Sequence, residues 1–131
     1  RFAAALLEAA SSRRDGAPIV LLAGGETTLA VEGSGRGGRN QEFALVAALD
    51  LQGVANVAVL SAGTDGTDGP TDAAGAFVDG STIERARQRG LDAHDFLRRQ
   101  DSYTLLHALG DLHRTGPTGT NVMDLVIGVV K

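Results

Sequence analysis

The chain has 131 residues, of which 43% are hydrophobic and 21% are charged, and its formal net charge is −4. This length and composition fit one soluble globular domain, and the acidic balance argues against a nucleic-acid or membrane-surface partner. The absence of cysteine excludes disulfides, thiol chemistry and cysteine-based metal sites. Because Lys131 is the one lysine, arginine must bind any anion inside the chain. No apolar run reaches transmembrane length, and we expect a cytoplasmic protein.

Apolar strand-like segments alternate with helical segments along the chain. Residues 1–15 predict a helix, which we interpret as a linker from a missing N-terminal domain. Strands are predicted at residues 19–23, 27–32, 54–60, 76–78 and 125–130. Further helices are predicted at residues 40–49, 81–89, 92–99 and 102–109. This alternation predicts an α/β fold over residues 1–131, specifically a three-layer α/β sandwich with a mixed, partly parallel sheet.

Three glycine-rich loops separate these segments, at residues 33–40, 61–75 and 115–121. A glycine inside a regular element costs about 0.5–1 kcal/mol relative to alanine, so such clusters indicate tight turns or close approach of backbone to a ligand. In open α/β sheets, ligands bind beyond the strand ends. The polar residues of the loops suit a small anion, and they are Arg36, Arg39, Asn40, Asp65, Asp68, Asp72, Thr118, Thr120 and Asn121. These residues can form one site only if the loops meet on one face.

Each loop also has a simpler interpretation. Arg36 and Arg39 could be solvated surface charges. Asp65 and Asp68 each precede a glycine and could form turns, and Asp72 could cap a helix. Composition alone leaves the binding and the structural interpretation open.

Common site motifs receive little support. Residues 33–38 match the dinucleotide pattern G-x-G-x-x-G, but the segment is so rich in glycine that the spacing carries little information. The phosphate-binding Walker pattern fails for lack of an internal lysine. The three histidines lack the spacing of metal ligands. A Mg²⁺ ion could still be held by one or two loop carboxylates together with phosphates.

Three segments of the chain form a specific combination, and they are GGETTLAVEGSGRGGRNQEFALVAAL, LSAGTDGTDGPTDAAGAFVDG and DSYTLLHALGDLHRTGPTGTNVMDL. With these segments, most of the chain from Gly24 onward resembles the MOFRL domain, which is the C-terminal domain of glycerate 2-kinases, a family also named hydroxypyruvate reductases. The resemblance implies ATP-dependent phosphorylation of D-glycerate with Mg²⁺ in a cleft between two domains. It also implies a Rossmann-like N-terminal domain that brings a lysine and much of the nucleotide site, so the chain alone should be inactive.

Under this resemblance the loop residues take specific roles. The predicted catalytic residues are Asp65, Asp68 and Arg39, with Asp65 and Asp68 also as Mg²⁺ ligands. The predicted substrate-binding residues are Glu26, Arg36, Asn40, Thr64 and Asp72. The predicted phosphate-binding residues are Thr118, Gly119, Thr120 and Asn121. A homodimer is a further hypothesis for the assembled protein.

Two rival functions remain at the sequence level. The first is an NAD(P)H-dependent hydroxypyruvate reductase, which rests on the G-x-G-x-x-G match and on the alternative family name. The second is a non-catalytic lid or structural domain. Loop arginines paired internally with acidic residues such as Glu42 would favour the lid.

Overall fold

The structure, a computed structural model, describes residues 1–12, 16–26, 28 and 33–131. The helices are α1 (Phe2–Ser11), α2 (Arg39–Asp50), α3 (Thr82–Gln88), α4 (Ala93–Arg98) and α5 (Ser102–Leu109). The strands are β1 (Ile19–Gly25), β2 (Val57–Gly63), β3 (Gly75–Asp79), β4 (Leu112–His113) and β5 (Asp124–Val130). The predicted strand at 27–32 lies outside the described residues, apart from Thr28.

The five strands form one sheet in the order β1-β5-β2-β3-β4, and every described pair of neighbours is antiparallel. The prediction of a mixed, partly parallel sheet is therefore wrong. The strand–helix–strand unit that led to this prediction is present, because β1 and β2 run in the same direction and α2 connects them. β5 lies between these two strands and runs opposite to both, so it converts one expected parallel pair into two antiparallel pairs.

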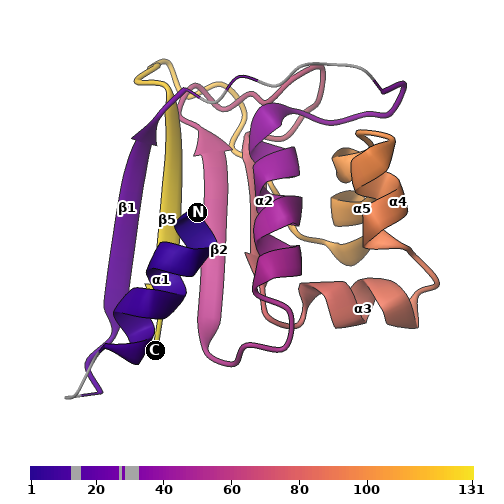
Figure 1. Ribbon diagram of the computed structural model, residues 1–131. Coiled ribbons are helices and arrows are strands. Elements are labelled where there is room, and N and C mark those ends of the chain that lie inside the picture. Colours follow the sequence, from indigo (N-terminus) through magenta and orange to yellow (C-terminus); the bar gives the residue numbers. More distant parts are fainter. Residues whose placement is uncertain (13–15, 27, 29–32) are drawn as a thin grey trace.

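Helices cover one face of the sheet, and the other face is open in the described residues (Figure 1). On β5, Val126 and Val130 are buried whereas Leu125 and Val129 are exposed. Burial thus alternates along this strand, as expected for a sheet with one covered face. The described residues form two layers, which corrects the predicted three-layer sandwich. The prediction assumed that apolar strands are buried on both faces, yet Leu22 in β1 keeps 63% of its surface exposed.

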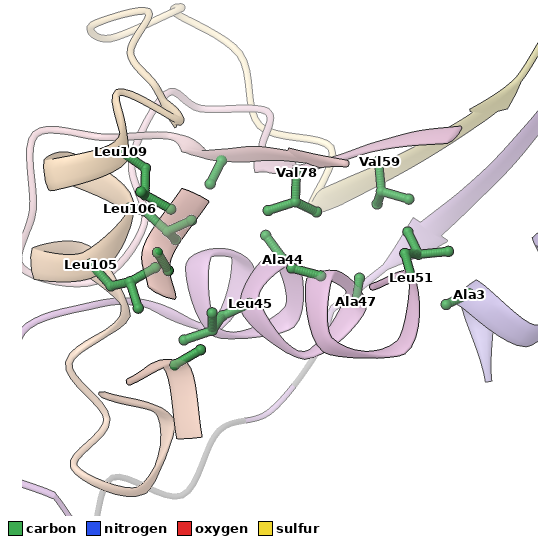
Figure 2. Close-up of a cluster of buried hydrophobic side chains, with 14 of the residues drawn as sticks. Ala3, Ala44, Leu45, Ala47, Leu51, Val59, Val78, Leu105, Leu106 and Leu109 are labelled. Atoms are coloured by element: carbon green, nitrogen blue, oxygen red, sulfur yellow. The ribbon is translucent and has the colours of Figure 1, made fainter. Parts of the chain in front are cut away.

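The core lies between α2, the sheet and α5, as Figure 2 shows. Ala44 and Ala47 of α2 lie against Val59 of β2 and Val78 of β3, and their small side chains let the helix approach the strands closely. The leucines of α5 complete this side of the core, and they are Leu105, Leu106 and Leu109. Interdigitated Ala, Val and Leu thus supply the packing in a chain without tryptophan.

Helix α1 packs on the covered face rather than extending away from the domain. Leu6 is fully buried, and a Cβ atom added at Gly128 in β5 would lie 2.7 Å from its Cδ2. The glycine therefore lets the helix contact the strand directly. None of the helices in the described ranges has the length and apolar content required to cross a bilayer.

Candidate functional site

One edge of the sheet gathers one end of each of the five strands and the start of a helix. The register places Asp124, the first residue of β5, between Gly25 at the end of β1 and Gly63 at the end of β2. β3 begins and β4 ends at the same edge, because Gly75 pairs with both Ala62 and His113. The three glycine loops lie along this edge, together with the N-terminus of α2 (Figure 1).

The second and third loops are bound to each other. The backbone N–H of Thr118 donates to the carbonyl of Asp65 at 3.1 Å, and its hydroxyl donates to the carbonyl of Thr64 at 2.6 Å. Asn121 Nδ2 donates to Asp65 Oδ2 at 3.3 Å. Gly66 has a φ of +89°, and a Cβ atom there would overlap the carbonyl oxygen of Gly116. Glycine is therefore required at this crossing by both backbone conformation and space.

The first and second loops meet at Asp68, whose side chain is 1% exposed. Asp68 Oδ1 accepts the backbone N–H of Asn40 at 3.0 Å, and Oδ2 accepts that of Gln41 at 2.9 Å. Both side-chain amides also donate to this carboxylate. The first N–H groups of any α-helix have no hydrogen-bond partner within the helix. In α2, a carboxylate from another loop accepts these hydrogen bonds. Burial raises the pKa of the Asp68 carboxyl, and these four hydrogen bonds oppose the rise.

The helix predicted at residues 40–49 begins one residue earlier, at Arg39, with Gly38 in the capping position. The side chain of Asn40 points into a buried network, where it donates to Asp68 and Asp124. Asp68, which was predicted to be catalytic and a Mg²⁺ ligand, is buried, and both of its oxygens accept hydrogen bonds from α2.

An ion pair joins Arg39 to the first residue of β5. Arg39 Nε donates to Asp124 Oδ2 at 2.6 Å, and Arg39 Nη2 donates to Oδ1 at 2.8 Å. Asn40 Nδ2 donates to the same Oδ1 at 3.0 Å, and Ser61 Oγ donates to Asn40 Oδ1 at 2.7 Å. The hydrogen bond to Asp124 raises the pKa of Arg39 and keeps its guanidinium charged. Arg39 is therefore a fixed cation at the loop edge, 33% exposed, and it can meet an anion there.

A pocket of about 380 Å³ adjoins this network. Asn40, Ser61, Asp124 and Glu26 form its polar side. Phe2, Phe43 and Val126 form its apolar side. A size of this order suits a small polar molecule. A pocket of about 420 Å³ at the opposite edge of the sheet is lined by residues 54–58 and lies away from the three loops, so we assign the site to the smaller pocket.

Arg36 belongs to a different cluster from Arg39. Its guanidinium lies 4.0 Å from the centroid of the Tyr103 ring, in cation–π contact. The Tyr103 hydroxyl donates to Asp72 Oδ1 at 2.8 Å, and Arg114 Nε donates to Asp72 Oδ2 at 3.0 Å. The hydrogen bond from Tyr103 lowers the pKa of Asp72, and that from Arg114 adds to the effect. Two predicted substrate-binding residues, Arg36 and Asp72, thus share this second cluster.

The remaining predicted residues occupy the joined second and third loops. Asp65 Oδ1 accepts hydrogen bonds from the backbone and the hydroxyl of Thr67, both at 3.0 Å. Thr118, Gly119, Thr120 and Asn121 are exposed at the tip of the third loop. Among the residues that the structure describes, no group of three or more histidine or acidic side chains is arranged to hold a metal ion.

Sequence reasoning missed three residues of the buried network, namely Asp124, Ser61 and Gln41. Asp124 was detectable as a charged residue at the head of an apolar strand, directly after a glycine loop. A carboxylate at such a position is buried, and burial is destabilising unless the carboxylate forms an ion pair or hydrogen bonds. Ser61 and Gln41 carry no comparable signal, because their partners lie 21 and 27 residues away.

Fold and site together define an α/β domain whose loop edge holds a fixed arginine beside a small pocket. The chain matches the sequence profile of the MOFRL family over residues 19–124, and it belongs to that family.

Similar proteins are longer than this chain. It is 56% identical over 113 residues to the D-glycerate 2-kinase of Thermotoga maritima, covering 86% of this chain and 27% of that protein. It is 52% identical over 114 residues to the glycerate kinase of Homo sapiens, covering 82% of this chain and 22% of that protein. A crystal structure of the glycerate kinase from T. maritima superposes with a TM-score of 0.93 at 51% identity, covering 98% of this chain and 31% of that one. The chain thus spans about a quarter of the length of these curated relatives.

Proposed function

We propose that this domain forms one wall of the interdomain cleft of a glycerate 2-kinase, which transfers the γ-phosphoryl group of ATP to D-glycerate. The observation that carries the proposal is the guanidinium of Arg39, which is held at the loop edge by Asp124, a residue that lines the 380 Å³ pocket. Phosphoryl transfer requires positioning and cationic stabilisation of spreading negative charge, and a fixed guanidinium supplies both. The glycerate kinase names of the relatives support the same reaction.

The loop residues divide between contact and support in this proposal. Arg39 binds the glycerate carboxylate or a phosphate oxygen. In the third loop, Gly119 to Asn121 offer donors to phosphate, whereas both donors of Thr118 are bound to the second loop. Asp65, in the loop joined to Asn121, orients the attacking hydroxyl or holds Mg²⁺. Asp68 acts indirectly, because its carboxylate is buried under α2.

The residues present fit Mg²⁺ only as a partial ligand set. Asp65 has a half-buried carboxylate in the second loop, and a kinase Mg²⁺ ion commonly takes one or two carboxylates plus phosphates. When bound, the ion neutralises charge on the phosphates of ATP. The lysine and most of the nucleotide site belong to the remaining polypeptide of the longer protein in this proposal.

The proposal is tested with a full-length enzyme that carries this domain. ATP-dependent phosphorylation of D-glycerate is expected, and Arg39→Ala should lower kcat/KM by more than tenfold, worth about 1.4 kcal/mol of transition-state stabilisation. A smaller loss removes Arg39 as a principal anion ligand. Adding hydroxypyruvate and NADH and following absorbance separates this kinase from a reductase. The antiparallel sheet gives the reductase little support, because a dinucleotide fold is built on parallel strands.

A non-catalytic lid is a second candidate, because one observation favours it. Both loop arginines have internal partners: Arg39 pairs with Asp124, and Arg36 lies on the Tyr103 ring. A lid predicts that Arg39→Ala leaves the chemical step unchanged and alters only the stability of the domain. Single-turnover phosphorylation measured beside the melting temperature therefore distinguishes the two candidates.

A further inference from the structure

A guanidinium carries five N–H donors and can present two forked edges, each of which can meet an oxyanion. Asp124 occupies one edge of Arg39, the one formed by Nε and Nη2, at 2.6 and 2.8 Å. Within the described parts of the chain, no hydrogen bond engages Nη1 of Arg39. The edge formed by Nη1 and Nη2 thus keeps donors for a second anion.

The two partners differ sharply in exposure. The Arg39 side chain is 33% exposed, whereas that of Asp124 is 4% exposed. The carboxylate therefore lies beneath the guanidinium and the opposite side of the cation reaches solvent. An incoming oxyanion would bind to Arg39 from the solvent side, because the like charge of Asp124, which lines the pocket, would repel it.

Asp124 is itself held from several directions. It begins β5 between β1 and β2, and Asn40 donates to its Oδ1 at 3.0 Å. Ser61 in turn fixes Asn40 at 2.7 Å. The orientation of Asp124 is therefore set by the sheet and transmitted to the arginine.

We propose that Asp124 is a positioning residue that clamps one edge of Arg39 and aims the other edge at a substrate oxyanion. This inference rests on the proposed function, because it requires Arg39 to bind a reactant. The oxyanion is a carboxylate or a phosphate, since both accept two parallel N–H donors in the geometry that a guanidinium offers.

Asp124 has two opposing effects on the binding of an anion by Arg39. A carboxylate beside Arg39 offsets part of the field that an incoming anion feels, so Asp124 weakens long-range attraction. It also removes the rotational freedom of a long side chain, which otherwise opposes forked binding. Removing the clamp charge should therefore reduce binding of the oxyanion in spite of the more positive site.

The test is the variant Asp124→Asn in the full-length enzyme, compared with Asp111→Asn as a matched control. Asp111 makes a similar two-bond pair with Arg85, at 2.7 and 3.0 Å, but joins α3 to the end of α5. The KM for D-glycerate and the KM for ATP are measured separately, together with the melting temperature. We expect Asp124→Asn to raise one KM by at least tenfold, and Asp111→Asn to change both by less than twofold.

The two KM values identify the anion. An increase confined to D-glycerate assigns the free edge of Arg39 to the carboxylate, and one confined to ATP assigns it to a phosphate. If both KM values stay within twofold of wild type in an active enzyme, the proposal is overturned. If the wild-type enzyme phosphorylates no glycerate, the proposed function fails first, so the two failures are distinguishable.

A double-mutant cycle keeps the test valid if Asp124→Asn also lowers stability. Lysine retains the charge of Arg39 but lacks the fork, so in Arg39→Lys the clamp has nothing to orient. Asp124→Asn should then add less than a threefold change in KM on the Arg39→Lys background. A full additional tenfold change would show that Asp124 acts independently of Arg39 and would overturn the positioning role.

Discussion

Oδ2 of Asp68 accepts two hydrogen bonds from Gln41, one from its backbone N–H and one from its side-chain amide, each at 2.9 Å. The pair joins the second glycine loop to the first turn of α2, which also carries Arg39. The position of the candidate anion ligand thus depends on a carboxylate from a different loop.

Asp68→Asn should lower the free energy of unfolding by about 1–3 kcal/mol, because a buried acceptor facing N–H donors is replaced by a donor on one side. Chemical denaturation of the domain measures this change. The matched control is Asp92→Asn, since Asp92 caps α4 from an exposed position with one hydrogen bond from His94, and asparagine is an equally good cap. Equal stability of Asp68→Asn and wild type would contradict the capping role.

Gly38→Ala should destabilise the fold by about 1–3 kcal/mol through overpacking. A Cβ atom at Gly38 would overlap the side chain and backbone of Asp68, although its φ of −144° is open to any residue. Gly24→Ala is the control, because a Cβ atom there meets only the carbonyl oxygen of Asp124 at 3.8 Å. The melting temperatures of the two variants distinguish the steric effect of the added Cβ atom from the loss of glycine's conformational freedom. Similar melting temperatures would refute a steric requirement at Gly38.

Tyr103→Phe should raise the pKa of Asp72, because the tyrosine hydroxyl is the main cause of its lowered value. A carboxyl whose folded pKa lies below its unfolded pKa stabilises the fold above the unfolded value, and this contribution is lost as pH falls through the folded value. The variant should therefore lose less stability than wild type on acidification below about pH 4. NMR titration of the Asp72 carboxyl tests the shift directly, and an unchanged titration midpoint would rule out the hydroxyl as its cause.

Asp65→Asn should lower kcat of the full-length enzyme by more than tenfold while leaving the melting temperature close to that of wild type. The reason is that Asp65 lies half-buried in the second loop and, under the proposed function, orients the attacking hydroxyl or holds Mg²⁺. Asp95→Asn is a control on α4, where Asp95 forms ion pairs with Arg98 and Arg99. Unchanged turnover in Asp65→Asn would remove this carboxylate from the mechanism.

Local patterns predicted most of the elements but not their neighbours in the sheet. The expected helix at 102–109 has the bounds of α5, and the strand expected at 76–78 lies within β3. β4 was missed because two residues are too short to show a periodicity. The position of β5 between β1 and β2 is a long-range pairing, and hydrophobic pattern alone does not specify it.

The candidate site was predictable as a set of loops but not as a network. Glycine clustering identified the three loops, and the structure shows that they contact one another. The roles of their side chains follow from partners distant in sequence: Arg39 and Asp124 are 85 residues apart. A loop arginine in the sequence therefore does not reveal whether it is solvated, paired or poised for a ligand, and only the contact with β5 distinguishes these states.

The strand that comes last among the described elements, β5, fills the gap between β1 and β2. Before its seven residues leave the ribosome, β1 has no described neighbour, because β5 is the strand that joins β1 to β2. The sheet of this domain therefore cannot close until β5 has been synthesised. Synthesis and folding of this domain are consequently sequential, and a stalled or clipped chain would leave β1 available for wrong pairings.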